Sequence, residues 1–131
     1  MNEKELREGI EKLLDSYFNT KTSHFSEAEL ACPCCGLNLV TPEMLEQAET
    51  IRALNGSKPM IVSSATRCAR HNKEVGGVSN SLHLYGCAMD VHISGVAAST
   101  LVKQSKKLGS PDAYCINENW AHISVPKKGD N

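Results

Sequence analysis

His83 and Asp90 are the residues whose types and spacing most directly suggest metal chemistry. The histidine lies in a loop, and the aspartate follows seven residues later in an apolar stretch that we predict to be a strand. Imidazole nitrogen and carboxylate oxygen both bind zinc at about 2.0–2.2 Å, and Gly86 and Ala88 let the backbone fold back so that both reach one ion. A carboxylate on an apolar strand also needs a counter-charge, which a metal supplies. Taken alone, the pair is a weak signal, and it is explained better by a loop histidine and a hydrogen-bonded aspartate.

A third nitrogen ligand would complete a catalytic zinc site with an open fourth position. The candidates are His24, His71, His92 and His122. His122 is the best placed, because it lies on the last apolar strand, which we expect to pair with the strand of Asp90. His92 lies two positions after Asp90, on the same face of the predicted strand. It is either a residue that orients a metal ligand or the substrate, or a surface histidine. We do not expect His24 or His71 to be ligands.

Four segments of the chain carry patterns that can be compared with known families. The first is the cysteine cluster at residues 31–36, after Phe25-Ser26-Glu27-Ala28-Glu29-Leu30, and the second is residues 63–72, around Arg67. The third is Ser81-x-His83-x-x-Gly86-x-Ala88-x-Asp90, and the fourth is Trp120-Ala121-His122-Ile123. In this order they resemble the D-alanyl-D-alanine peptidases, a family that includes phage cell-wall endolysins and shares its fold with the hedgehog signalling domain. The cysteine cluster is similar to the start of a phage- and prophage-type subgroup.

The resemblance implies a zinc ion ligated by His83, Asp90 and His122, with water at the fourth position. Zinc lowers the pKa of such a water to about 7 and polarises the peptide carbonyl. Arg67 matches the arginine of the family and fits a role beside the developing oxyanion, because a guanidinium stays charged and offers a fork of donors. The alternative for Arg67 is a structural loop arginine.

Ser81 and Trp120 are the residues that we predict to contact the substrate. Ser81 matches the serine of the zinc motif, where it either binds the substrate terminus or hydrogen-bonds its own loop. Trp120 belongs to the segment that carries the third ligand.

The general base is where this sequence departs from the pattern of the family. Several members carry an acid three positions before the last histidine, where this chain has Asn119, and an amide cannot accept the proton. Glu118 is the nearest acid. If residues 118–122 are extended, alternation places Glu118, Trp120 and His122 on one face. We therefore hypothesise that Glu118 is the base, with a solvated turn residue as the alternative.

Four of the six cysteines could converge: Cys32, Cys34, Cys35 and Cys68. They would form either a second, four-thiolate zinc site or a disulfide that ties the N-terminal loop to Cys68. Adjacent Cys34 and Cys35 weigh against the zinc site.

Two other interpretations concern the cysteines. A thiol redox function on Cys32-x-x-Cys35 is disfavoured, because the next helix starts only at Pro42 and a redox pair usually precedes a helix directly. Cys87 and Cys115 lie among apolar residues, and we predict both to be small buried hydrophobes.

The elements that position these residues follow from hydrophobic periodicity and turn signals. We predict helices at about residues 3–18, 42–54 and 97–108, and a helical turn that Ser26 and Glu29 open as a capping box. Strands are predicted at 60–62, 88–93, 114–116 and 120–125, and residues 65–82 as a long surface loop. The pattern indicates one α+β domain over residues 1–131, with a small antiparallel sheet covered by helices on one side. Residues 1–22 would be a helix and connector, and 126–131 a frayed tail.

Composition excludes several classes of function. The 131 residues carry a net charge of −1 and only six aromatic side chains (one Trp, three Tyr, two Phe), which argues against nucleic-acid and anionic-membrane binding. No apolar run approaches the roughly 18 to 20 residues that span a bilayer. The N-terminal segment mixes acids and bases and does not resemble a secretory signal, so we expect synthesis in the cytoplasm.

The leading interpretation is a zinc metallopeptidase that hydrolyses peptidoglycan peptides, as a D-alanyl-D-alanine carboxypeptidase or with endolysin-type activity. The alternative is a catalytically inactive, hedgehog-like zinc-containing binding module, which the missing acid at position 119 favours. The absence of a signal peptide is compatible with a phage lysin released through a holin-type partner, and equally with a cytoplasmic dipeptidase-like role.

Overall fold

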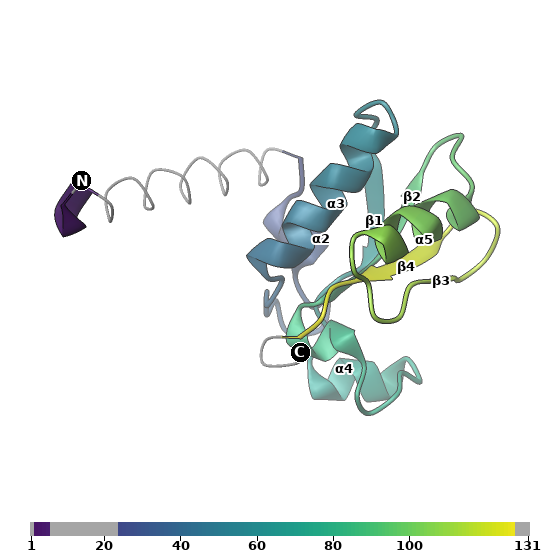
Figure 1. Ribbon diagram of the computed structural model, residues 1–131. Coiled ribbons are helices and arrows are strands. Elements are labelled where there is room, and N and C mark those ends of the chain that lie inside the picture. The colour runs from purple at the N-terminus through teal and green to yellow at the C-terminus, as the bar shows by residue number, and fades with distance from the viewer. Residues whose placement is uncertain (1, 6–23, 128–131) are drawn as a thin grey trace.

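The computed structural model describes residues 2–5 and 24–127 (Figure 1). Four strands form one antiparallel sheet in the order β1-β2-β4-β3. The strands are β1 (Met60–Ser64), β2 (Ala88–Ile93), β3 (Tyr114–Cys115) and β4 (Ala121–Ser124). The helices are α2 (Glu27–Leu30), α3 (Pro42–Leu54), α4 (Ala69–Glu74), the 3-10 helix η1 (Leu82–Tyr85) and α5 (Ala98–Lys107). The predicted α+β fold with a small antiparallel sheet is confirmed.

Local capping explains where α2 and α3 begin. Ser26 caps α2 in a capping box with Glu29, as the sequence predicts. Thr41 caps α3 by accepting a hydrogen bond from the backbone N–H of Met44, and Pro42 occupies the first helical position. The helix ends at Leu54, directly before Asn55 and Gly56. Side chains close to each N-terminus thus determine where α2 and α3 begin.

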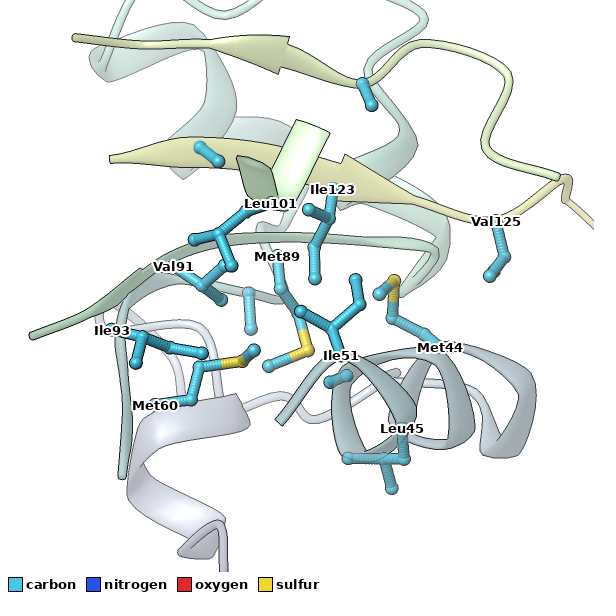
Figure 2. Close-up of a cluster of buried hydrophobic side chains, with 14 of the residues drawn as sticks. Met44, Leu45, Ile51, Met60, Met89, Val91, Ile93, Leu101, Ile123 and Val125 are labelled. Atoms are coloured by element: carbon cyan, nitrogen blue, oxygen red, sulfur yellow. The ribbon is translucent and has the colours of Figure 1, made fainter. Parts of the chain in front are cut away.

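The hydrophobic core lies on one face of the sheet. Met89, Val91 and Ile93 alternate along β2 and are completely buried. They pack with Ile51 of α3 and Leu101 of α5, as Figure 2 shows. The other residues of β2, including Asp90, therefore point to the opposite face of the sheet, which is the face available for a polar site.

Two expectations from the sequence need correction. Residues 65–82 are not a continuous loop, because α4 lies within them; the Cys68 thiol caps this helix by accepting from the backbone N–H of His71. Cys115 is exposed rather than buried, since β3 is a two-residue strand at the edge of the sheet. Cys87 is buried, as predicted.

Most of the helix predicted over residues 3–18 lies outside the described residues, as do residues 128–131 of the predicted tail. In the part of the chain that the structure covers, no helix has both the length and the apolar character that crossing a bilayer requires.

Candidate metal centre

His83, Asp90 and His122 converge on the polar face of the sheet. Antiparallel pairing of β2 with β4 places Asp90 directly opposite His122, and η1 brings His83 to the same place. Asp90 Oδ1 is 3.2 Å from His83 Nε2 and 2.9 Å from His122 Nδ1. All three side chains are buried, and their ligand atoms lie within 4.8 Å of one another. The three residues that the sequence predicted as metal ligands are thus brought together.

The outer nitrogens of both imidazoles are also bound to oxygen acceptors. His83 Nδ1 donates to the carbonyl oxygen of Ala65 at 2.6 Å, and His122 Nε2 donates to Asp112 Oδ1 at 3.1 Å. With these protons in place, a neutral ring directs a lone pair from its inner nitrogen toward Asp90. Two lone pairs and a carboxylate oxygen then face one another, and a cation between them would stabilise this arrangement. The donor set therefore fits a divalent ion, and one nitrogen of each ring is oriented for it.

The charge of Asp90 is maintained despite its burial. Burial raises the pKa of this carboxyl, but its side-chain interactions with His122 and His83 outweigh that effect, and the pKa falls well below its usual range. Arg67 adds an ion pair, with its Nη2 atom 3.5 Å from Asp90 Oδ2. Asp90 thus stays an anion at neutral pH, the form that a metal ligand requires.

The loop before β2 positions His83 through two local features. Ser81 Oγ accepts a hydrogen bond from the backbone N–H of His83 at 3.3 Å and caps η1. Gly86 ends η1 in the left-handed region at φ +68°, and a Cβ atom there would collide with the backbone carbonyl of Leu39. Only glycine fits this position, which explains its place in the spacing between His83 and Asp90.

A bulge in β1 directs Arg67 toward the same group. The pairing of β1 with β2 shifts between Val62 and Ser64, so that Ser64 lies opposite Asp90. Arg67 Nε donates to Ser64 Oγ at 3.2 Å, and Nη1 donates to Asn72 Oδ1 at 3.3 Å. Asn72 is buried and is itself anchored by donating to the carbonyl of Val78 at 2.8 Å. The guanidinium is thus fixed on three sides, with one edge toward Asp90.

Asp112 and Tyr114 belong to the site, and the sequence reasoning missed both. Asp112 Oδ1 accepts hydrogen bonds from His122 and, at 2.5 Å, from Ser124 Oγ. The ring of Tyr114 stacks on His122, with centroids 4.5 Å apart and planes 12° apart. Burial raises the pKa of Tyr114, and the nearby carboxylates of Asp90 and Asp112 raise it further. The predicted strands at 114–116 and 120–125 could have identified Tyr114, because pairing them as a hairpin places Tyr114 opposite His122.

Trp120 and His92 form a neighbouring pair at the edge of the site. Their ring centroids are 5.3 Å apart. His92 Nδ1 donates to the backbone carbonyl of Asn119 at 3.0 Å, which leaves Nε2 as an acceptor. His92 follows Asp90 by two positions on β2, so both residues point to the same face of the sheet.

Glu118 is not part of the His-Asp-His group. Residues 116–119 form a turn, and β4 begins only at Ala121, so the extended alternation expected for residues 118–122 does not hold. Glu118 lines a pocket of about 670 Å³ with Cys115 and with Ala97, which precedes α5. Tyr114 faces His122, so its neighbour Cys115 points to the opposite face, where α5 packs. None of His83, Asp90 and His122 lines this pocket.

A groove of about 450 Å³ includes Asp112 in its lining. Its lining combines apolar side chains with one lysine: Val78, Asn80, Leu82, Pro111, Asp112, Pro126 and Lys127. Because Asp112 contacts His122, the groove leads to the metal-ligand group.

Comparison with known families agrees with this geometry. A family model described as Peptidase M15 matches residues 18–124, most of the chain, and this span contains all three candidate ligands, Arg67 and Asp112. A search of curated proteins found no significant match. The match over most of the chain shows that the protein belongs to the peptidase M15 family, whose members are zinc peptidases.

Proposed function

We propose that this protein is a zinc-dependent peptidase that hydrolyses peptidoglycan peptides, with His83, Asp90 and His122 as the zinc ligands. The observation that carries the proposal is the convergence of these three side chains with their outer nitrogens already held by Ala65 and Asp112. Such outer contacts are typical of histidines that bind metals. Membership of the peptidase M15 family supports zinc as the ion.

When bound, zinc supplies a Lewis acid that polarises the scissile carbonyl and makes water nucleophilic at neutral pH. The protein itself must then bind the substrate and stabilise the negative charge that develops on the carbonyl oxygen. Arg67 fits this second role, because its guanidinium is rigidly held and lies beside Asp90. The phenol of Tyr114 keeps its proton at neutral pH and is half exposed over His122, so it can donate a hydrogen bond to the same oxygen.

Substrate binding is assigned to the surface around the three ligands. Lys127 lines the groove with its ammonium 4.7 Å from the ring centroid of Tyr85, and this ammonium fits a carboxylate of a short peptide, while Val78 and Leu82 offer apolar contacts. On the other side, Trp120 and the free Nε2 atom of His92 face the substrate. In this proposal, Ser81 acts on the substrate indirectly, because its hydroxyl holds the loop of His83.

The placement of the lysine favours a carboxypeptidase that releases a terminal D-alanine over an endopeptidase. The test is incubation of the zinc-loaded protein with two peptides, a stem peptide ending in D-alanyl-D-alanine and the same peptide lacking both D-alanines, with products identified by mass spectrometry. Release of D-alanine from the first peptide supports the proposal, and cleavage within either stem would replace it with an endolysin-type activity. The Asp90→Ala variant, which loses a ligand, is the control.

The second candidate is a zinc-containing binding module without turnover. Two observations favour it: Asn119 occupies the position where an acid is expected, and Glu118 lines a pocket to which none of the three proposed ligands contributes. In the same assay, a protein that binds zinc and retains peptide but yields no product from either substrate would establish this candidate and exclude the peptidase.

A further inference from the structure

A second cluster of metal-binding side chains lies apart from the His-Asp-His group. The sulfur atoms of Cys32, Cys34, Cys35 and Cys68 lie within 4.8 Å of one another, and all four thiols are free. Cys34 Sγ is 3.5 Å from Cys32 Sγ and 3.2 Å from Cys68 Sγ. Four sulfurs around zinc at bond lengths of about 2.3 Å stand about 3.8 Å apart. The spacing in this cluster is therefore close to what one zinc ion requires.

Three of the sulfurs come from one closed loop. The carbonyl of Cys32 accepts from the backbone N–H of Gly36 at 2.8 Å, and the N–H of Cys32 donates to the carbonyl of Leu37 at 2.7 Å. Gly36 adopts φ +77°, which glycine tolerates and other residues rarely adopt. The tight turn gathers the three sulfurs. A Cys-x-x-Cys spacing, here Cys32 and Cys35, is the usual one in structural zinc sites.

Cys68 supplies the fourth sulfur from the segment between β1 and α4. Its backbone N–H donates to Cys32 Sγ at 3.4 Å, and its own sulfur accepts from the N–H of His71 at 3.4 Å. Such N–H donors favour the thiolate, the form that binds metal. Thr66 joins the two segments further, because its N–H donates to the carbonyl of Leu30 and its hydroxyl accepts from the N–H of Leu39. Contacts of the polypeptide thus hold all four sulfurs together.

We propose that Cys32, Cys34, Cys35 and Cys68 bind a second zinc ion with a structural role. Four thiolates fill the coordination sphere of zinc and leave no position for a substrate, as in other structural sites. Cys32 is buried, whereas Cys34 and Cys35 are exposed, so the ion can enter from solvent. A disulfide would use two of the four sulfurs and leave the convergence of the others unexplained.

The consequence of this site concerns Arg67. Cys68 follows Arg67 directly, so an ion that fixes Cys68 to the loop of residues 32–37 also fixes the backbone that presents the guanidinium to Asp90. Because the binding energy of a structural zinc ion contributes to folding, loss of the ion will lower the melting temperature. The cysteine cluster therefore stabilises the fold and positions Arg67.

The first test is the zinc content of the purified full chain and its variants, measured by elemental analysis. We expect about two zinc ions per chain in the wild type, and about one in the double variant His83→Ala/His122→Ala, which lacks two ligands of the first site. The pair Cys34→Ser/Cys35→Ser should also retain about one. Cys115→Ser is the matched control, since this exposed cysteine lies outside the cluster, and it should retain two.

The second test does not depend on the folding of a cysteine variant. The double histidine variant, loaded with cobalt in place of zinc, should show the thiolate-to-cobalt charge-transfer absorption in the near ultraviolet. Titration of the denatured, metal-free wild type with a thiol reagent, after purification without reductant, should find all six thiols. No bound metal in the double histidine variant, or the loss of two thiols to a disulfide, would overturn the proposal. Because neither test measures peptide hydrolysis, the outcome is independent of the proposed peptidase activity.

Discussion

Asp112 Oδ1 lies 3.1 Å from His122 Nε2, on the side of the ring opposite Asp90. This contact places a proton on Nε2 and directs the lone pair of Nδ1 toward Asp90 and His83, where the metal is expected. Ser124 donates to the same carboxylate oxygen and holds Asp112 in place. Asp112 is therefore a positioning residue, which determines the nitrogen that His122 offers to the ion.

The first prediction concerns metal affinity. Asp112→Ala should weaken zinc binding by about 10- to 100-fold, because His122 loses the acceptor that orients it. Competition with a chromogenic chelator measures the affinity, and Glu118→Gln provides a control carboxylate outside the group. An unchanged affinity of Asp112→Ala would show that the contact does not orient His122 for the metal.

Arg67 is the subject of the second prediction. Arg67→Lys should lower kcat by about 100- to 1,000-fold with zinc content unchanged, because an ammonium cannot contact Ser64, Asn72 and Asp90 together. Arg70→Ala is the matched control, since Arg70 is exposed and pairs only with Glu74 among the ion pairs of the described residues. Steady-state kinetics would refute the role of Arg67 if both variants retained the kcat of the wild type.

The third prediction distinguishes two views of Glu118. A general base contributes about 100- to 10,000-fold to turnover, so the hypothesis drawn from the sequence requires a loss of that order in Glu118→Gln. The placement of Glu118 in a pocket on the α5 side predicts instead a change of less than about threefold, well below that contribution. Turnover at saturating substrate, with zinc content as the control, decides between the two.

The sequence was sufficient to predict that His83, Asp90 and His122 come together, and spacing and strand pairing explain why. The spacing from His83 to Asp90 contains the one glycine that lets η1 turn back into β2. His122 was identified because apolar alternation marked β4 as a strand that could pair with β2. Capping residues likewise marked the starts of α2 and α3.

Other parts of the site depend on contacts that the sequence does not encode locally. Asp112 reaches His122 from an irregular segment between α5 and β3, where no periodicity applies. The position of Glu118 depends on a turn, which interrupts the alternation on which the base hypothesis rested. The bulge that brings Ser64 opposite Asp90 arises from pairing between strands, and the residue sequence of β1 does not reveal it.

The fourth prediction concerns the support of Arg67. A Cβ atom at Gly77 would overlap the side-chain amide of Asn72 and approach Arg67 Nη1 within 3.1 Å. Gly77→Ala should therefore destabilise the fold by about 1–3 kcal/mol, as overpacking usually does, and lower kcat through Arg67. Thermal unfolding and kinetics measure the two effects, with the exposed Ser79→Ala as control. If Gly77→Ala behaved as Ser79→Ala does, the close packing around Asn72 would be disproved.

Recovery of peptide hydrolysis as zinc is added back to chelator-treated protein tests the metal dependence of the proposed activity. We expect D-alanine release to be lost on chelation, to return in the wild type as zinc is restored, and never to return in Asp90→Ala at equal protein concentration. Hydrolysis that persists through chelation, or that Asp90→Ala supports at the rate of the wild type, would contradict a zinc peptidase centred on His83, Asp90 and His122.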